Sequence, residues 1–492
     1  MSQRLGLRDR RARHLAVAVV IALAIALLLG SASPAFAKRR TRFKGVASTY
    51  VIPYSYVMVS GRLQYKASDG VWRGLRDKYV RLYLGNGYGG WVYSVRVRTG
   101  AKGKFSFTLL ADNRYRVRFL ATTTYYGTSK NFSASRAWSA AHGNARRNGR
   151  TGFVGPAAYH RAWRFPVGDN KMIDDPVVAR DGTIYITKSD VDTGQSTLYA
   201  LNPSGTVKWY RALGIGGGGP TVGANGIVYL FAFDKVLAYR PNGTLLWSYT
   251  VTGGQAGSPV VGSNGTVYFT GSDSSHQYRV YAVSSSGGFL WSSALGSQSS
   301  IPSLGSDNTV YVGTSSNTLR AFSSSGAPKW TYTATGHINE SPVVGSDGTI
   351  YFHTWAMTSA DRAVYAVSSA GALKWRHGLD GYGRMPALGR DGTVYTADNS
   401  GSTNGHQLLA LRPNGTVKWH RHFSEDVGSP IVDGVGRLYL SMVGGKFYAL
   451  NPYGSTKWTT SNCSDRLQPP AIGRYGTLYV ESRDGALLAF KR

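Results

Sequence analysis

The feature that most constrains the fold is a pair of residues that recurs eight times at one spacing. A Pro is followed nine residues later by a Tyr at Pro176/Tyr185, Pro220/Tyr229, Pro259/Tyr268, Pro302/Tyr311, Pro342/Tyr351, Pro386/Tyr395, Pro430/Tyr439 and Pro470/Tyr479. Successive Pro residues lie 39–44 residues apart, which is the length of one four-stranded propeller blade. The repeat predicts a ring of similar small sheets.

Each repeat predicts two β-hairpins. The first contains Asp-Gly or Asn-Gly, such as Asp181-Gly182, because these dipeptides supply the positive φ angles of a tight hairpin turn. The second runs from an Ala to a Trp nine residues later, with a Gly four residues before the Trp. These triplets are Ala200/Gly205/Trp209, Ala238/Gly243/Trp247, Ala282/Gly287/Trp291, Ala321/Gly326/Trp330, Ala366/Gly371/Trp375, Ala410/Gly415/Trp419 and Ala449/Gly454/Trp458.

The eighth repeat lacks its Trp strand, because it reaches Ala489 and the sequence stops at Arg492. Trp163 precedes Pro176 by 13 residues, and the other Trp-to-Pro intervals are 11 or 12 residues. We therefore expect the strand around Trp163 to complete the last blade. Residues 161–492 would then form a closed eight-bladed β-propeller, and closure removes exposed sheet edges.

The repeated Trp residues are predicted to pack one blade against the next. They are Trp163, Trp209, Trp247, Trp291, Trp330, Trp375, Trp419 and Trp458. Burying one indole removes about 200 Å² from water, worth roughly 5 kcal/mol before strain and entropy. Cys463 is the only Cys, so no internal disulfide can form and packing of this kind has to stabilise the chain.

Positive charge is concentrated before the repeats. The net charge is +31, and residues 38–170 contain 25 Lys and Arg against 4 Asp and Glu, a net of +21. Within residues 41–135, alternating apolar and polar residues predict short strands with one buried face. About seven such strands favour a small antiparallel sandwich. Segments such as Ser60–Leu63 and Gly103–Phe107 also resemble immunoglobulin-like modules of secreted actinobacterial proteins.

Five Arg residues occupy alternate positions on two of these predicted strands: Arg96, Arg98, Arg114, Arg116 and Arg118. If the strands pair, the side chains form one dense cationic face. A solvated face needs no ligand, but a charge asymmetry of this size also fits a polyanionic partner. We favour an anionic polymer of the cell envelope over nucleic acid.

The first 37 residues have the layout of a secretory signal peptide. A cluster of Arg residues precedes an apolar run from Leu15 to Leu29, and small residues follow up to Ala37. This order is typical of exported proteins, and the run is short for a membrane span of about 20 residues. We expect a secreted or envelope-associated monomer without a membrane-spanning helix after cleavage, and a lead-in linker at residues 136–160.

The repeats resemble the PQQ-like (quinoprotein-type) propeller superfamily, with Leu198–Trp209 and Leu408–Trp419 as examples. The resemblance covers residues 138–492. Quinone-dependent dehydrogenases of this superfamily have a pair of adjacent Cys residues, which this chain lacks, and Ca²⁺ ligands on long insertions. We therefore expect no cofactor, no metal and a non-enzymatic branch. His337 and Glu340 alone offer a metal only two ligands.

The repeated Pro is expected to begin the innermost strand of each blade. The residues just before it would then surround one mouth of the central channel. The polar or charged members are Asp174, Asp175, Glu340, Arg384 and Gln468. Varied polar groups around a channel make a plausible ligand site, although ordinary solvated loops have the same composition.

Three functions remain compatible with these features. The leading hypothesis is an exported, non-catalytic protein whose propeller binds a protein or glycan while the basic module binds an anionic envelope polymer. The alternative is a glycan-active lyase or hydrolase that uses the channel mouth. The third is an envelope assembly factor, against which the absence of a lipid-attachment Cys argues.

Overall fold

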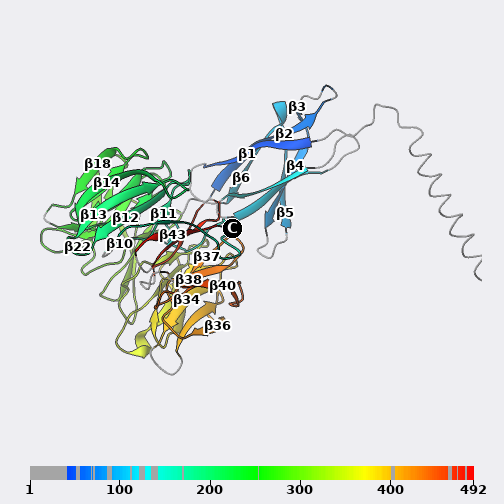
Figure 1. Ribbon diagram of the computed structural model, residues 1–492. Coiled ribbons are helices and arrows are strands. Elements are labelled where there is room, and N and C mark those ends of the chain that lie inside the picture. The colour runs from blue at the N-terminus through cyan, green and yellow to red at the C-terminus, as the bar shows by residue number, and fades with distance from the viewer. Residues whose placement is uncertain are drawn as a thin grey trace, which may run out of the picture.

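The structure is a computed structural model in which almost all regular elements are β-strands (Figure 1). It describes residues 41–50, 56–67, 69, 72–85, 91–110, 113–120, 128–134, 142–168, 171–252, 254–400, 405–461, 463, 468–473, 475–482 and 485–491. The helical elements among them are two short 3-10 turns, η2 (Ala101–Gly103) and η3 (Ser359–Asp361). None of the described residues forms a helix suited to crossing a membrane. The all-β class is confirmed, and the predicted signal peptide lies outside the described residues.

Eight sheets follow one another in the described part of residues 161–492. Sheets 1 to 4 are, in order, β10 (Lys171–Ile173), β11 (Val177–Val178), β12 (Ile184–Asp190), β13 (Gln195–Leu201) and β14 (Val207–Ile215); β15 (Gly217–Val222), β16 (Val228–Ala232), β17 (Lys235–Tyr239) and β18 (Leu245–Thr250); β19 (Gln255–Ala256), β20 (Val260–Val261), β21 (Val267–Ser272), β22 (Tyr278–Val283) and β23 (Phe289–Ala294); and β24 (Ser303–Leu304), β25 (Val310–Gly313), β26 (Thr318–Phe322) and β27 (Pro328–Thr333).

Sheets 5 to 8 are built in the same way. They are, in order, β28 (Val343–Val344), β29 (Ile350–His353), β30 (Ala363–Val367) and β31 (Leu373–Gly378); β32 (Tyr382–Gly383), β33 (Ala387–Leu388), β34 (Val394–Asn399), β35 (His406–Leu411) and β36 (Val417–Phe423); β37 (Ile431–Val432), β38 (Leu438–Ser441), β39 (Phe447–Leu450) and β40 (Thr456–Thr460); and β41 (Ala471–Ile472), β42 (Leu478–Glu481), β43 (Leu487–Phe490) and β9 (Arg161–Phe165).

One row of residues is the same in every one of these sheets. In sheet 1, Tyr185 lies opposite Ala200, Ala200 lies opposite Trp209, and a β-bulge follows the Ala. The Tyr and Trp rings meet across this small residue with their centroids 5.7 Å apart. The corresponding distance is 5.7–6.2 Å in the other seven sheets. The two nine-residue spacings of the sequence therefore bring Tyr, Ala and Trp into register.

Each Trp also joins its own sheet to the next. The indole N–H of Trp209 in sheet 1 donates to the carbonyl oxygen of Pro241 in sheet 2 at 2.8 Å. Trp163, Trp247, Trp291, Trp330, Trp375 and Trp419 make the equivalent bond at 2.8–3.2 Å. Only Trp458 is buried, with 8% of its surface exposed, and the other seven are half-buried. The transfer free energy expected for a fully buried indole therefore overestimates the contribution of each of those seven half-buried residues.

Sheet 8 is assembled from both ends of the repeat region. Trp163 of β9 lies opposite Ala489 of β43, and a bulge follows this Ala as in the other sheets. Strands β43 and β9 come from distant parts of the sequence, so no hairpin turn joins them. Trp458 therefore has no turn of sheet 8 to bond. Its indole N–H donates instead to the carbonyl oxygen of Pro156 at 3.1 Å. The Tyr159 ring contacts Phe490 with a centroid distance of 5.2 Å, so residues 156–159 occupy the place of the missing turn.

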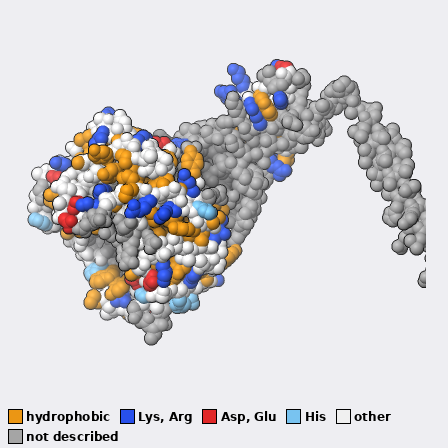
Figure 2. Space-filling view, viewed as in Figure 1, with side chains coloured by type: hydrophobic (Ala, Val, Ile, Leu, Met, Phe, Trp, Pro, Cys, Tyr) orange, Lys and Arg blue, Asp and Glu red, His pale blue; other side chains and the backbone are white. Residues whose placement is uncertain are grey.

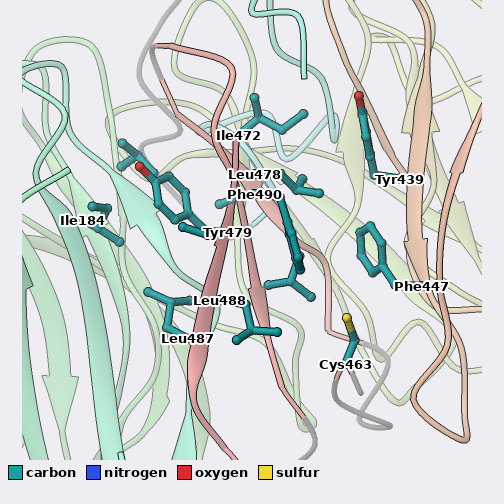
Figure 3. Packing of buried hydrophobic residues seen from close by; sticks show 14 of the residues in the cluster. Ile184, Tyr439, Phe447, Cys463, Ile472, Leu478, Tyr479, Leu487, Leu488 and Phe490 are labelled. Atoms are coloured by element: carbon teal, nitrogen blue, oxygen red, sulfur yellow. The ribbon is translucent and has the colours of Figure 1, made fainter. Parts of the chain in front are cut away.

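The core around this joint is apolar. Leu487, Leu488 and Phe490 of sheet 8 pack between Ile184 of sheet 1 and Phe447 of sheet 7 (Figure 3). Cys463 belongs to the same cluster and is fully buried. Burial raises the pKa of its thiol to about 12, so the thiol stays protonated and unreactive at neutral pH.

The N-terminal strands form two further antiparallel sheets. One contains β1 (Thr41–Tyr50), β2 (Tyr56–Lys66), β3 (Trp72–Gly74) and β6 (Lys104–Leu110), and the other contains β5 (Trp91–Arg98), β4 (Tyr79–Gly85), β7 (Asn113–Phe119) and β8 (Thr128–Ala134). Leu63, Val80, Leu82 and Phe119 are buried. The sheets agree with the expected strands, and the assignment to an immunoglobulin-like module stays a prediction.

The Trp-to-Gly contact between sheets predicts a specific destabilisation. Gly326 has a φ of +88°, and a Cβ there would lie 2.5 Å from Cδ2 of Trp291 in the preceding sheet. Gly296 has a φ of +80° with nothing within 4 Å of such a Cβ. We expect Gly296→Ala to cost about 1 kcal/mol of stability from backbone strain. Gly326→Ala should cost about 1–3 kcal/mol more because the indole must move, and urea unfolding of both variants measures the difference.

Equal unfolding midpoints for the two variants would show that the indole contact contributes nothing. The pair is matched because both glycines adopt a left-handed backbone conformation, so only the contact with Trp291 distinguishes them.

Candidate functional site at the centre of the ring

The first strands of the sheets line the centre of the ring, where those of neighbouring sheets, such as β11 and β15 or β33 and β37, contact one another. A segment from before the repeats is bound to them. The N–H groups of Leu304, Val344, Leu388 and Val432 donate in turn to the carbonyl oxygens of Ala145, Arg146, Asn148 and Gly149 at 2.7–3.0 Å. Each donor is the second residue after the repeated Pro, in sheets 4 to 7. Residues 145–149 therefore pair otherwise open strand edges, and this part of the expected linker belongs to the propeller.

This segment inserts a buried cation into the ring. Arg147 is fully buried, and its Nε donates to the carbonyl oxygen of Pro302 at 3.2 Å. Burial lowers the pKa of Arg147 to about 10, and Asp175 opposes that shift. The guanidinium is still charged at neutral pH. His142 supports the segment, since its Nδ1 lies 2.6 Å from the carbonyl oxygen of Arg147, and burial lowers the pKa of this imidazole.

Carboxylates of sheets 1 and 8 influence one another, and one of them, Asp175, acts on this cation. Burial first and then the charge of Asp174 raise the pKa of Asp175, Arg147 lowers it and Glu481 raises it, which gives a value of about 7. Asp175 is half-buried. Buried acids of like charge resist ionising together, so Asp175 titrates near neutral pH.

Two other predicted mouth residues are structural partners on this side. Asp174 Oδ2 accepts the N–H of Gly219 in sheet 2 at 3.0 Å. With its amide oriented to donate, Gln468 reaches the carbonyl oxygen of Ile173 and Oε2 of Glu481, both at 3.2 Å. Both side chains therefore tie neighbouring sheets together, which restricts their use for a ligand.

A second polar group lies between sheets 5 and 6. Glu340 Oε1 is 3.9 Å from Arg384 Nη1, and Glu340 Oε2 is 3.9 Å from His353 Nδ1. Both separations exceed hydrogen-bond length. Glu340 Oε2 and Arg384 Nε are buried atoms without a hydrogen-bond partner in the described part of the chain. Burial lowers the pKa of His353, so its ring is neutral at pH 7.

Aromatic side chains extend from the same three chain segments. His337 stacks on Trp355 with centroids 5.8 Å apart, and Trp355 stacks on Tyr382 at 6.1 Å. The Arg362 guanidinium lies 4.3 Å from the centre of the Tyr382 ring. Trp355 and Tyr382 remain 38% and 41% exposed. We call His337, Trp355 and Tyr382 the aromatic ledge.

The five predicted mouth residues therefore form two groups, on sheets 8 and 1 and on sheets 5 and 6. Sequence analysis missed Arg147, Glu481 and His353, which lie outside the positions before the repeated Pro. His337, which together with Glu340 would offer a metal only two ligands, directs its Nδ1 to the carbonyl oxygen of Ser315. The described residues contain no group of three His, Cys, Asp or Glu placed to hold a metal.

The predicted cationic face differs in one respect from expectation. Strands β5 and β7 do not pair directly, because β4 lies between them. Arg81 of β4 lies opposite both Arg96 and Arg118, so three Arg residues form one row across three strands. Arg96, Arg98 and Arg118 are exposed. Arg114 and Arg116 occupy positions on β7, and their side chains lie outside the described part.

Arg96 and Arg98 have local partners. The Arg96 guanidinium lies 4.3 Å from the centre of the Tyr79 ring, and Arg98 Nε is 3.8 Å from Asp77 Oδ1. Both contacts are at the exposed surface, where an ion pair contributes little. The row of like charges across neighbouring strands is unfavourable by itself.

The described sheets define a β-propeller of the PQQ-like repeat type. The chain matches the family described as outer membrane protein assembly factor BamB over residues 194–281 and 276–492. Because these segments span more than half of the chain, the protein belongs to this family. No curated protein matches the chain.

Solved structures show the same fold. Quinohemoprotein alcohol dehydrogenase from Comamonas testosteroni aligns with a TM-score of 0.57 and 11% identity over 72% of this chain and 80% of that one. The dehydrogenase ADHIIG from Pseudomonas putida HK5 has a TM-score of 0.54 and 13% identity over the same shares. BamB from Moraxella catarrhalis has a TM-score of 0.49 and 15% identity over 68% and 97%. At these identities the likeness to the two dehydrogenases establishes the propeller fold alone.

The raised pKa of Asp175 predicts a pH-dependent stability. The folded protein holds this proton up to about pH 7, whereas an unfolded Asp loses it near pH 3.8. Ionising Asp175 therefore costs folding free energy, and its contribution to stability declines from about pH 4 to about pH 7. We expect Asp175→Asn to remove this decline. Across that window the free energy of unfolding of the variant should come to exceed that of wild type by up to about 4 kcal/mol. Urea unfolding at several pH values measures it, and a pH-independent difference would contradict it.

Proposed function

We propose that this protein is a secreted, non-catalytic binding protein of the bacterial cell envelope. A signal peptide at residues 1–37 exports it, and an immunoglobulin-like module at residues 41–135 binds an anionic envelope polymer. The propeller of residues 161–492, an eight-bladed ring closed by the Trp163 strand, is a platform for a protein or glycan. The molecule acts as a monomer.

Membership of an outer membrane assembly factor family supports the platform. Its fold supports it as well, because every sheet is fixed to the next by a Trp hydrogen bond or by the Pro156 substitute. A rigid ring presents its connecting loops at constant positions, as binding scaffolds do. The buried Arg147 and the acids around it serve to hold the ring centre rather than to react.

The Arg row across β5, β4 and β7 is the observation that carries the polymer-binding half of this proposal. Aligned like charges raise the energy of the isolated module, and a polyanion relieves that cost. Blue atoms in Figure 2 mark Lys and Arg among the described side chains of the module. A ligand bound by such a row should dissociate as salt is added.

Replacing Arg96, Arg98 and Arg118 together by Gln should weaken binding to a purified anionic wall polymer. By counterion release, the slope of log K against log salt should fall by about 2–3. Fluorescence anisotropy of labelled polymer over a range of salt concentrations measures both effects. The control replaces Lys235, Arg240 and Lys457 by Gln, since these three are also exposed and the change in net charge is equal.

Binding that is insensitive to salt would refute the electrostatic half of the proposal. So would an equal loss in the two triple variants, because net charge rather than the position of Arg96, Arg98 and Arg118 would then explain the affinity.

A further inference from the structure

Three chain segments at sheets 5 and 6 run side by side and share one order of residues. Each places a ring on the outside and a charged or titratable group further in: His337 with Glu340, Trp355 with His353, and Tyr382 with Arg384. His337 and Trp355 exchange backbone hydrogen bonds at 2.9 Å in both directions. A Cβ on Gly383 would lie 3.0 Å from His353. In the second and third segments the ring and the polar group are two residues apart, and two residues of extended chain span about 6.6 Å, so the ring there lies about that far along the chain from the polar group.

The aromatic ledge is stepped. Its adjacent rings are inclined by only 20° and 16°, and their centroids are 5.8 and 6.1 Å apart. Stacked carbon atoms approach to about 3.5 Å, so the rings must be displaced sideways by more than about 4 Å. A displaced stack leaves a strip of each ring uncovered, in agreement with the exposure of Trp355 and Tyr382.

The polar groups of these segments include one unused acceptor and one unused donor. Glu340 Oε2 accepts no hydrogen bond, and Arg384 Nε donates none, in the described part of the chain. These two atoms are buried, so a ligand would meet the outer atoms of the pair instead. Glu340 Oε1 and Arg384 Nη1 lie 3.9 Å apart, too far for a direct hydrogen bond, on side chains that are 31% and 36% exposed. A hydroxyl group both donates and accepts, so one hydroxyl between Oε1 and Nη1 would bond both.

We infer that this part of the channel mouth binds an uncharged sugar ring, with the ring's C–H face on the aromatic ledge and its hydroxyl groups between Glu340 and Arg384. A pyranose combines these features, because it has an apolar face and a rim of hydroxyls. Apolar walls with a few placed polar groups are typical of small-molecule sites. This inference rests on the proposed function and names the ligand class of its platform.

The charge balance separates this site from the Arg row of the N-terminal module. Glu340 and Arg384 compensate each other, and His353 is neutral because its pKa is lowered by burial. Arg362 projects over Tyr382, but its Nε already donates to the carbonyl oxygen of Ala356 at 2.8 Å. A bond to a neutral carbonyl leaves the Arg362 charge in place, so these groups have a net charge of one positive unit, which attracts a polyanion less than the aligned Arg residues of the N-terminal module do.

Titration calorimetry of the full chain tests the inference with uncharged oligosaccharides of β-linked glucose, N-acetylglucosamine and mannose and of α-linked glucose. We expect at least one to bind, with affinity lowered at least tenfold by Trp355→Ala and at least fivefold by Glu340→Gln. Tyr453→Ala is the control, because Tyr453 is also exposed, at 67%, and lies outside the ledge. It should leave the affinity within twofold of wild type.

Absence of binding by every sugar up to about 10 mM, the weak end of specific recognition, would overturn the inference. Binding that survives both substitutions, or capture of unglycosylated peptides but not sugars at the ledge, would do the same. If Trp355→Ala unfolds, Tyr382→Ala and Glu340→Gln decide the question. Binding of the anionic polymer to wild type is measured in parallel. If wild type does not bind the polymer, the proposed function is refuted, and the sugar titration can still be interpreted.

Discussion

The contact between a Tyr and a Trp across an Ala is the interaction on which the propeller depends. It aligns the last three strands of each sheet, and the same indole then bonds the next sheet and covers a Gly there. Any residue larger than Ala in the middle would separate the two rings. Because the contact links only nearest neighbours, stability in such an array is the sum of repeat and interface contributions. An open array would leave its last sheet without a partner.

Closure satisfies that requirement at the point where β9 pairs with β43. Trp163 completes the row of sheet 8 and bonds the turn of sheet 1, so this interface is equivalent to the others. The interface between sheets 7 and 8 is not equivalent, because no turn connects β43 to β9. Pro156 supplies the carbonyl for both Trp458 and the Tyr439 hydroxyl. The segment before the repeats therefore stabilises the ring at two places: Pro156 at its outside and residues 145–149 at its centre.

The repeats could be predicted from sequence because each depends on residues at constant separations, and even the Trp163 strand follows from one interval. The remaining features depend on contacts between distant segments. Nothing in the local pattern shows that Arg147 enters the ring, since its partners Pro302 and Asp175 are 155 and 28 residues away. Arg81 was overlooked because a lone Arg between apolar neighbours predicts only a strand. The pairing order that places it between Arg96 and Arg118 is a tertiary property.

The division between packing and binding positions follows from the same geometry. Residues in the Tyr–Ala–Trp row cannot vary without loosening an interface, and the N–H groups of the first strands in sheets 4 to 7 are used by the lead-in. The residues that precede each Pro lie beyond both sets of contacts. On sheet 1, Asp175 acts on Arg147 and Asp174 bonds Gly219, and on sheet 8 Gln468 reaches Glu481, which commits that side to structure. On sheets 5 and 6, Glu340 and Arg384 keep unused hydrogen-bonding atoms beside exposed rings in the described part of the chain. Ligand recognition is therefore expected on the side of the ring where the residues before each Pro are not committed to Arg147 or to a neighbouring sheet.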